Sequence, residues 1–449
     1  MSNAGPGSRP AGRSRVLAWA LWDCGSTGLI AIVLTFVFSV YLTDAVGTGE
    51  TAGATPASWL GRAMTVAGLA VALIAPVTGV WVDAPRRRQR MLAVLTAVLV
   101  ILTASMSLIR DDPRYLWAGL ALLAVTAACN ELASVPYNAM LRQFATPEST
   151  GRISGLGSAS GYFGSVTLLL VVYAGFIAGD GPKRGLLKIP IADGQNVRAA
   201  MLLTAAWMVV FALPLLVTVR HPPELPGSTA RVGVLGIYRK LWSDIRGLWR
   251  TDRNVLYFLL ASAVFRDGLA GVFTFAAVLG VSVYGISPAD VLLFGVAASV
   301  VAALGAVLGG VLDDHVGSKA IIVASLASIL AVGAALLALS GPAAFWTCGL
   351  LVSLFIGPAQ ASARALILRM TADGMEGVAF GLYTMTGRAL SFIAPFMFFT
   401  FIDAFGADRA GLGGLLVMLA AGLIAMVVVR VPRAIGHRAN AVDGAGARG

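Results

Sequence analysis

Hydrophobic residues in this chain come in long runs that short polar stretches separate. Twelve of these runs have about the 20 residues that an α-helix needs to cross a bilayer, or more. The first six cover residues 16–42, 59–82, 91–109, 115–140, 151–178 and 197–219. The second six cover residues 255–284, 290–312, 320–340, 343–367, 376–403 and 409–430. The pattern predicts an all-α membrane protein with twelve transmembrane helices.

The longest polar stretch, residues 220–254, divides the runs into two groups of six. We expect a six-helix bundle at 16–219 and a second at 255–430, with polar tails at 1–15 and 431–449. Inside the polar stretch, apolar residues recur at helical spacing among basic residues, and two tryptophans flank them. This pattern predicts an amphipathic helix in the membrane interface. The residues are Ile237, Leu241, Ile245 and Leu248, with Trp242 and Trp249.

Composition and charge agree with this picture. Only 12% of the residues are charged and 58% are hydrophobic, whereas about a quarter of a soluble domain is charged. The net charge of +11 could indicate nucleic acid, but basic residues of membrane proteins gather in cytoplasmic loops. With both termini inside, 22 of the 33 basic residues fall in cytoplasmic segments and 8 fall outside. We therefore expect cytoplasmic termini, a lipid bilayer as partner and no nucleic acid. The excess of Arg over Lys, with abundant Ala and Gly, indicates a bacterial plasma membrane.

No catalytic or metal-binding pattern is recognisable in the sequence. Cys24, Cys129 and Cys348 lie in apolar runs without metal-ligand spacing, and all three histidines lie in predicted loops. There is no nucleophile–base pair and no phosphate-binding loop. The sequence therefore predicts no metal, no cofactor and no enzymatic activity.

Each half carries the same short motif after its second run. Gly79 is followed by Asp83 and Gly310 by Asp314, with a basic residue five positions beyond each aspartate. Such duplication is typical of secondary transporters, which bind substrate between their repeats near the midplane. We interpret the motif as a cytoplasmic gate that contacts basic groups and helix N-termini. The predicted gate residues are Gly79, Asp83, Arg87, Arg88, Gly310, Asp314, Gly317 and Lys319.

Both copies resemble the signature G-x-x-x-D-R-x-G-R-K of the major facilitator superfamily, although Ala84, Arg86, His315 and Ser318 depart from it. A closer resemblance, to the fungal vacuolar effluxers and their bacterial relatives, lies in WALWDCGSTGLIAIVLTFVFSVY (19–41), YNAML (137–141), GRISGLGSASGYFG (151–164), FRDGLAGVFTFAAVLG (265–280) and GPAQASARALILRM (357–370). The resemblance implies two pseudo-symmetric six-helix bundles, and amino acids are what the fungal members release from the vacuole. The chain departs from that family at Cys24, Gly25 and Arg266, where Ala, Asn and a neutral residue are usual.

Six charged residues fall inside the predicted runs, where a charge is costly and is usually functional or paired. They are Asp23, Glu131, Arg266, Asp267, Arg364 and Arg388. Asp23 shares one helix face with Ser26 and Thr27, and Asp267 occupies the corresponding place in the second half. We interpret both aspartates as part of a polar site at the midplane. The alternative is a structural role as helix caps or interhelical contacts.

The three intramembrane arginines lie in the second half. Arg364, with Gln360 one turn earlier, suits an anion or a carboxylate, because a guanidinium stays charged and binds in two places. The alternative is a partnership with an acidic residue across the bundle. Arg388 either faces the cavity or forms a lock with a carboxylate, and Arg266 is assigned to the same pathway.

Glu131 is our candidate proton carrier, and Tyr137 and Asn138 accompany it on the fourth run. No histidine lies in a run, so a carboxylate must change its charge between access states. An arginine nearby would favour the charged form. The carboxylate without an Arg partner is therefore the better carrier, and we favour Glu131 over Asp23. The alternative for Glu131 is a permanent ion pair.

These features predict a proton-coupled secondary transporter of a small polar solute, with an amino acid as one candidate, that works by alternating access. The first alternative is a multidrug exporter of the same fold, which the lack of proline in residues 151–178 counts against. The second is a non-transporting membrane receptor or scaffold.

Overall fold

The structure is a computed structural model that describes residues 12–47, 55–218, 234–251 and 253–430. Most of the predicted tails 1–15 and 431–449, and the first part of the predicted linker, lie outside the described residues. The described part contains twelve helical segments that are long and apolar enough to cross a membrane. The predicted all-α fold with twelve transmembrane helices is confirmed.

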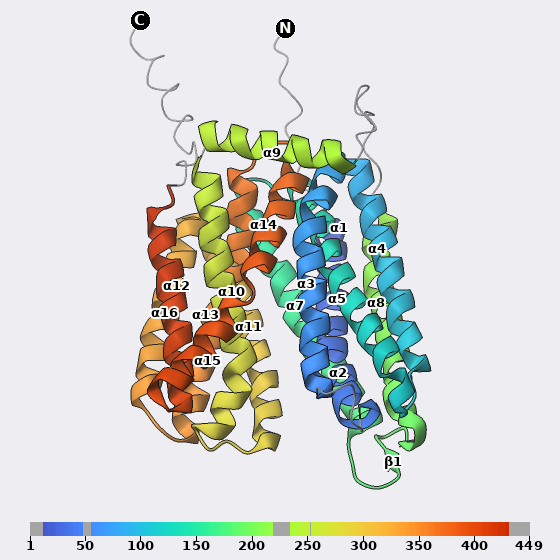
Figure 1. Ribbon diagram of the computed structural model, residues 1–449. Coiled ribbons are helices and arrows are strands. Elements are labelled where there is room, and N and C mark those ends of the chain that lie inside the picture. Colours follow the sequence, from blue (N-terminus) through green and yellow to red (C-terminus); the bar gives the residue numbers. More distant parts are fainter. Residues whose placement is uncertain (1–11, 48–54, 219–233, 252, 431–449) are drawn as a thin grey trace, which may run out of the picture.

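Six of these segments make up the N-terminal half (Figure 1). The first segment consists of α1 (Arg13–Ile30), the π-helix Ala31–Phe36, α2 (Phe38–Tyr41) and a second π-helical turn at Leu42–Val46. The others are built on α3 (Pro56–Trp81), α4 (Pro85–Ser105), α5 (Leu116–Ala139) with α6 (Leu141–Phe144), α7 (Thr150–Val172) and α8 (Gln195–Thr218). A two-stranded hairpin, β1 (Lys183–Arg184) and β2 (Ile189–Pro190), precedes α8.

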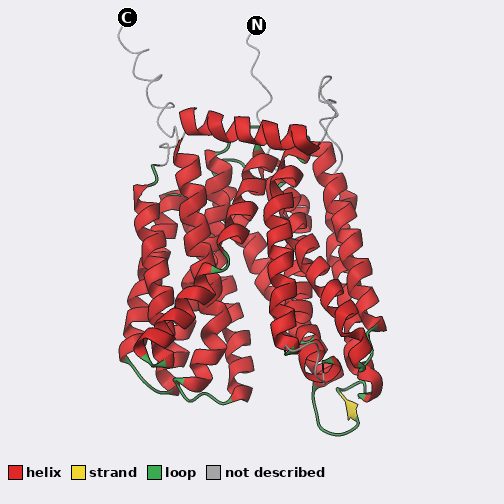
Figure 2. Ribbon diagram, viewed as in Figure 1, coloured by secondary structure: helices red, strands yellow, loops and turns green. Residues whose placement is uncertain are grey.

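The other six segments make up the C-terminal half. They are α10 (Arg253–Ser282), α11 (Pro288–Val316), α12 (Ser318–Ala338), α13 (Pro342–Met370), the pair α14 (Glu376–Leu390) and α15 (Ile393–Phe405), and α16 (Asp408–Val428). Almost all of the described chain outside the loops is helical, as Figure 2 shows.

The eleventh segment was predicted as one helix over 376–403, and it is broken between α14 and α15. Pro395 has no N–H to donate to a carbonyl one turn earlier, so a continuous helix would lose a hydrogen bond there. The Ser391 hydroxyl donates to the Arg388 carbonyl at 2.9 Å and so satisfies one acceptor at the break. Sequence reasoning missed this break because prolines are common within membrane helices.

The two halves stand side by side and contact each other mainly at the end where α9 (Val234–Thr251) lies, as Figure 1 shows. Between the halves, α3 packs on α14 and α7 packs on α11. We call this end of the bundle the α9 end. Helix α9 crosses it, in contact with α3 and α10. The side chains of Ile237, Leu241, Ile245 and Leu248 lie outside the described part.

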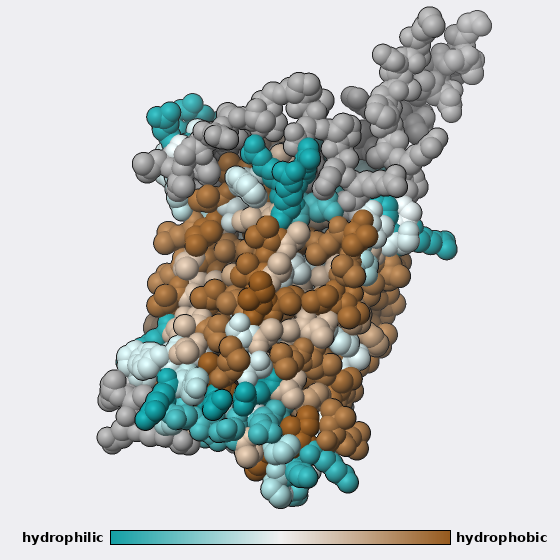
Figure 3. All heavy atoms as spheres, turned by 90° about the vertical axis from the view of Figure 1, so that its right-hand side faces the viewer, coloured by the Kyte–Doolittle hydropathy of each residue, from teal (hydrophilic) through white to brown (hydrophobic). Residues whose placement is uncertain are grey.

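The outer surface suits a bilayer. Figure 3 shows apolar side chains gathered in a broad middle band of the visible face, with hydrophilic side chains toward both ends. Many large apolar side chains are exposed on membrane-length helices, such as Leu73 at 65% and Val210 at 63%. Lipid tails can cover such a surface, whereas water cannot do so without a large free-energy cost.

Candidate functional site

A polar cavity of about 190 Å³ lies between the two halves, on α1, α5 and α13. Six of the predicted site residues line it together, although they come from three separate parts of the chain. They are Asp23, Ser26, Thr27, Tyr137, Asn138 and Arg364, joined by Trp22, Ile30, Asn130 and Ser134. Ser26 donates to Asn130 Oδ1 at 2.7 Å, so the cavity wall is ordered by side-chain hydrogen bonds.

A second cavity of about 180 Å³ adjoins the first, because Thr27 and Ile30 line both. Its other walls come from the π-helix after α1 and from α7, α10 and α11, and they are mostly apolar. The polar cavity therefore continues, on the side away from the α9 end, into an apolar space that both halves line.

Arg364 reaches across from the C-terminal half and is held entirely by the N-terminal half. Its Nε donates to Ser154 Oγ at 2.9 Å, and Nη2 donates to the Ser154 carbonyl at 2.5 Å and to Ser158 Oγ at 2.9 Å. Its Nη1 donates to Asn138 Oδ1 at 3.3 Å and lies 3.6 Å from Asp23 Oδ2. Four hydrogen bonds and the ion pair with Asp23 tie this guanidinium to the N-terminal half, so Arg364 holds the halves together in this state.

Aromatic side chains on the N-terminal half support this contact. Trp19 stacks on Tyr137 with ring centroids 4.7 Å apart, and its Nε1 donates to the Tyr137 carbonyl at 3.1 Å. The Arg364 guanidinium lies 5.3 Å from the Trp19 ring. The sequence reading did not single out Trp19, Ser154 or Ser158. The polar spacing of Ser154 and Ser158, four residues apart on one face, could have indicated the last two.

Glu131 forms an ion pair with Arg388 of the opposite half. Both side chains are about one-third exposed, so the ion pair is only partly buried. Our argument that Glu131 is the carboxylate without an arginine is therefore wrong, because α14 brings Arg388 from 257 residues away. Two roles were considered for each of these residues. The structure shows Glu131 in an ion pair and Arg388 in a lock with a carboxylate.

Asp267 lies at the break in the eleventh segment. Its Oδ2 accepts a hydrogen bond of 2.9 Å from the backbone N–H of Ala394, in the first turn of α15, and the residue is only 8% exposed. The backbone N–H groups in the first turn of α15 have no carbonyl partner within the helix, so the carboxylate supplies an acceptor for one of them. The negative charge also lies at the positive end of the helix dipole. The geometry matches the helix-cap alternative for Asp267.

The remaining predicted pathway residues are separate from the polar cavity. Arg266 donates to the Tyr383 carbonyl at 3.2 Å and its guanidinium lies over the Tyr383 ring, 3.7 Å from the centroid. Gln360 is exposed and does not line the polar cavity. The structure therefore does not bring Gln360 together with the substrate-pathway residues around Arg364.

At the α9 end, the first motif copy contacts the start of α14 in the other half. Asp83 Oδ1 accepts from the backbone N–H of Val378 at 3.2 Å, and a side chain at Gly79 would collide with the Gly377 carbonyl. Arg88 donates to the carbonyls of Val82, Ala139 and Asp83 and forms a 3.1 Å ion pair with Glu376. Arg87 is half-buried nearby.

Glu376 is the centre of this contact, and sequence reasoning missed it. Arg142 Nε lies 2.8 Å from its second carboxylate oxygen, and the side chains of Arg88 and Glu376 are 3% and 4% exposed. Arg142 also donates to the carbonyls of Leu368 and Thr371 and pairs with Asp373. A lone glutamate at the start of an apolar run carries no signal that two arginines from the other half will enclose it.

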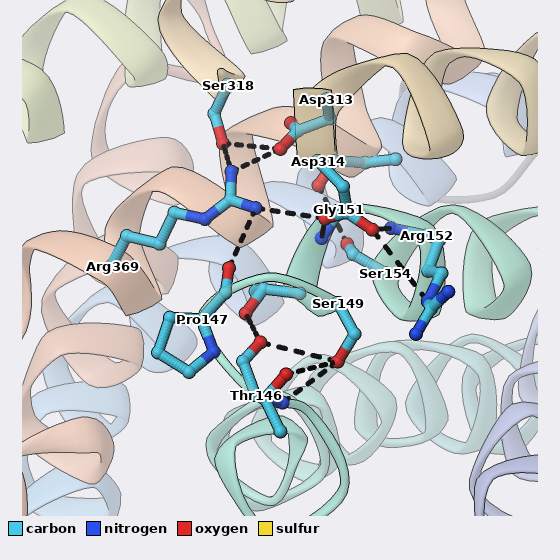
Figure 4. A network of polar contacts seen from close by, with 12 residues as sticks. Thr146, Pro147, Ser149, Gly151, Arg152, Ser154, Asp313, Asp314, Ser318 and Arg369 are labelled. Carbon is cyan, nitrogen blue, oxygen red and sulfur yellow. Dashed lines mark hydrogen bonds and ion pairs between the residues drawn. The ribbon is translucent and has the colours of Figure 1, made fainter. Parts of the chain in front are cut away.

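The second motif copy contacts the start of α7 (Figure 4). Asp314 accepts from the backbone N–H groups of Gly151 at 2.7 Å and Arg152 at 3.2 Å. Arg369 pairs with Asp314 at 3.0 Å and with Asp313, and it donates to the Pro147 carbonyl across the interface. Asp83 and Asp314 thus stand in equivalent places, each at the N-terminus of a helix in the opposite half. Sequence reasoning missed Asp313 and Arg369.

Two further motif residues serve the fold of their own half. Gly317 has φ +96°, a conformation that favours glycine, and it joins α11 to α12. Lys319 donates to the carbonyls of Val427 at 2.9 Å and Val429 at 2.5 Å, at the end of α16. Lys319 was predicted to be a gate residue that contacts the other half. This prediction is wrong, because Lys319 caps a helix of its own half, the C-terminal half. Gly310, in contrast, lies against Gly151 and Gly155 of the N-terminal half.

Known proteins resemble this chain over most of its length. A family model described as vacuole effluxer Atg22 like matches residues 56–439. An uncharacterized MFS-type transporter, YxiO of Bacillus subtilis (strain 168), is 21% identical over 413 residues, which is 92% of this chain and 94% of that protein. Autophagy-related protein 22-1 of Neosartorya fischeri is 24% identical over 308 residues, 63% of this chain and 48% of that protein. The chain spans about half the length of this fungal relative.

Solved structures show the same fold at low sequence identity. The major facilitator superfamily transporter FucP in its outward conformation matches with a TM-score of 0.66 and 15% identity, over 94% of this chain and all of that one. The proton:xylose symporter XylE matches with a TM-score of 0.70 and 14% identity, over 92% and 94% of the two chains. Family match, relatives and fold agree: this chain is an integral, multi-pass membrane protein of the Atg22-like vacuole effluxer family, with the fold of the major facilitator superfamily.

Proposed function

We propose that the protein moves a small polar solute across the membrane by alternating access, coupled to protons, and that an amino acid is one candidate solute. The observation that carries this proposal is the polar cavity between the halves, which a continuous set of contacts between the halves closes off at the α9 end. A site between two repeats, closed on one side only, is the geometry that alternating access requires.

The lining of the polar cavity favours a polar solute. Its walls carry a carboxylate, a guanidinium and two Asn side chains. These groups suit a molecule that carries hydrogen-bonding groups better than they suit the large apolar compounds of a multidrug exporter.

Proton coupling needs a carboxylate whose environment differs between the two access states. Glu131 and Asp23 each contact an arginine of the other half, so each contact depends on how the halves stand. When the halves separate at the α9 end, the carboxylates lose partners that favour their charged form, and protonation becomes easier. We keep Glu131 as the leading candidate, because its side chain is 31% exposed, whereas that of Asp23 is 19% exposed.

We further propose that the α9 end faces the cytoplasm of a bacterial cell. This assignment rests on the distribution of basic residues, 22 against 8, and on the bacterial relative YxiO. In this orientation, the described state is closed to the cytoplasm and its cavity continues toward the outside.

Reconstitution tests the proposed function. Purified protein in proteoliposomes is offered labelled amino acids and other small polar solutes, with and without a pH gradient across the membrane. We expect at least one solute to accumulate only when both the protein and the gradient are present. Transport of hydrophobic dyes alone would support a multidrug exporter, and binding without transport would support a receptor. Accumulation that is independent of the pH gradient would contradict proton coupling but not transport.

A further inference from the structure

Helix α9 has one exposed face that combines aromatic and basic side chains. Successive residues of an α-helix are turned by about 100°, so three exposed aromatic residues of α9 fall within about 40° of one another. Three exposed arginines form a second stripe directly beside them. The residues are Tyr238, Trp242 and Trp249 in the first stripe and Arg239, Arg246 and Arg250 in the second. We call these six residues the α9 face.

The start of α9 lies at the depth of the membrane-spanning helices. The Tyr238 hydroxyl donates to the carbonyl of Leu73 in α3 at 2.6 Å. Leu73 precedes the last residue of α3, Trp81, by about two turns, or roughly 12 Å. Its side chain belongs to the exposed apolar surface that suits a bilayer. The lipid that surrounds α3 therefore also reaches the first turns of α9.

The arginines of the α9 face carry positive charge that is not offset nearby. Residues 234–253 contain five basic residues and two aspartates, which leaves a net charge of +3. In the part of the chain that the structure describes, none of these three arginines takes part in an ion pair. An anionic partner would supply the missing counter-charge.

Anionic phospholipid fits both stripes. Trp and Tyr rings favour the headgroup level of a bilayer, where one side of the ring is apolar and the other is wet. Basic residues near the membrane surface attract negatively charged headgroups. Water alone would leave Trp242, which is 69% exposed, without an apolar neighbour. An acidic protein would first have to displace the headgroups around α3.

Helix α9 also connects the two halves. At its start, Tyr238 is bonded to α3 of the N-terminal half. At its end, Arg253 Nε of α10 donates to the Trp249 carbonyl at 3.0 Å, and the rings of Trp249 and Tyr257 lie 6.2 Å apart. The contact between α3 and α14 closes the same end of the bundle. A helix fastened to α3 and α10 in this way must move or detach when the halves separate there.

We infer that the α9 face is a docking surface for anionic phospholipid headgroups, and that lipid bound there holds α9 across both halves. Bound anionic lipid thereby favours the state that is closed at the α9 end. This inference goes beyond the proposed function, and it does not depend on which solute is moved or on which side of the membrane α9 lies.

Nanodiscs of defined lipid composition test the inference. The full-length protein, without its three native cysteines, carries a cysteine in place of Val378, a buried residue whose N–H contacts Asp83 across the closed end. Its labelling by a membrane-permeant thiol reagent is measured in phosphatidylcholine with and without phosphatidylglycerol. We expect phosphatidylglycerol to slow labelling several-fold. High salt should reduce this effect, because ions screen charges at the membrane surface.

Replacing the three arginines of the α9 face by Gln should remove the effect of phosphatidylglycerol. Each basic residue near an anionic surface contributes roughly 5-fold in affinity, so the three together contribute roughly 100-fold. The rise in unfolding temperature when phosphatidylglycerol is added to the detergent-purified protein measures this binding. The matched control replaces Lys183, Arg184 and Lys188 by Gln. It removes the same charge from the hairpin at the opposite end (Figure 1) and should leave the effect intact.

Tyr238→Phe separates docking from holding, because it keeps the ring and loses the hydroxyl that bonds to Leu73. This variant should still be stabilised by phosphatidylglycerol, but its labelling should no longer be slowed. Slowed labelling in Tyr238→Phe would overturn the holding role.

Four outcomes would overturn the docking surface. Labelling is equal in the two lipid compositions at low salt, the arginine variant keeps the full effect, or the hairpin control loses the effect as well. In the fourth, inorganic phosphate slows labelling in phosphatidylcholine as much as phosphatidylglycerol does, which would indicate a site for a free anion.

Discussion

Asp23 and Glu131 each contact a guanidinium that belongs to the opposite half of the molecule. An ion pair within one half would persist through a transport cycle, whereas a pair between halves is made and broken with each change of access. Breaking a pair in a poorly solvated place leaves two charges without partners, which costs several kcal/mol unless one becomes neutral. At the scale of single residues, this is how the proton coupling that we propose would follow from the separation of the halves.

Glu131→Gln should abolish accumulation driven by a pH gradient while exchange of solute down its own gradient continues. The amide keeps the shape of the side chain but cannot bind and release a proton. Labelled-solute uptake and counterflow in proteoliposomes measure the two activities. Glu148→Gln, at an exposed position before α7, is the control. If Glu131→Gln still concentrates solute like the parent protein, the assignment is wrong and Asp23 or Asp267 becomes the candidate.

Asp267→Ala should lower the unfolding temperature of the purified protein, and Asp267→Asn should change it little. Asn retains an acceptor for the Ala394 N–H, whereas Ala removes it, and loss of such a cap costs about 1 kcal/mol. Asp403→Ala, at an exposed position of α15, is the control. If Asp267→Asn is stable but loses proton-driven accumulation, Asp267 carries a proton and its role is more than structural.

At the scale of helices, small residues decide how closely the halves approach at the α9 end. A side chain at Gly155 of α7 would come within 2.3 Å of the Ala306 carbonyl, and one at Gly79 of α3 within 2.4 Å of the Gly377 carbonyl. Helix backbones can touch in this way only where neither carries a side chain. These contacts, with the aspartates at the starts of α7 and α14, keep the α9 end shut.

Gly155→Val should therefore favour the state that is open at the α9 end. The branched side chain has no room between α7 and α11 while they are in contact. Labelling of a single cysteine introduced at Ser158 with a membrane-permeant thiol reagent should become faster. Gly68→Val on α3, where an added Cβ meets nothing within 4 Å, should leave the labelling rate unchanged. Equal rates in Gly155→Val and the parent protein would contradict the closed contact.

Asp83→Asn and Asp314→Asn should slow transport while leaving solute affinity nearly intact, because both residues act on helix ends away from the cavity. A carboxylate at a helix N-terminus contributes about 0.3–2 kcal/mol, so we expect the closed state to lose roughly 2- to 30-fold in population. Asp314→Asn should have the larger effect, since it also weakens the pair with Arg369. Turnover and binding are measured separately, with the exposed Asp180→Asn as control. Loss of binding at unchanged turnover would refute a gating role.

At the scale of the whole molecule, the two halves place equivalent residues at equivalent ends, and contacts between these residues close the α9 end. The contacts between the halves that involve Arg88, Arg142, Asp314 and Arg369 all lie at the α9 end. The hairpin of β1 and β2 lies at the opposite end (Figure 1). The side of the membrane on which α9 lies is therefore the side to which the described state is closed.

In a background without Cys24, Cys129 and Cys348, a cysteine at position 235 should resist an impermeant thiol reagent applied to intact cells. A cysteine at Leu186, which is 82% exposed in the hairpin, should react. This expectation follows from the excess of basic residues at the α9 end. Labelling of position 235 from outside intact cells would refute the orientation.

The helices of this protein could be predicted from local sequence patterns. Local composition and spacing predict the twelve apolar runs, the split at residues 220–254 and the duplicated Gly–Asp motif. Each apolar run forms a helix because the backbone groups within a bilayer must hydrogen-bond to one another. Helix geometry also placed Asp23, Ser26 and Thr27 on one face, and the structure finds all three at the polar cavity. The break before α15 was missed, because it depends on Asp267 from a distant helix as well as on Pro395.

The partners of the charged residues, in contrast, follow from how the helices pack. Arg364 with Asp23, Arg388 with Glu131, and Glu376 with Arg88 and Arg142 join residues more than 200 positions apart, so no spacing rule could pair them. Packing of α7 on α11 and α3 on α14 brings these charges together, and the low polarity between helices then makes each partner matter.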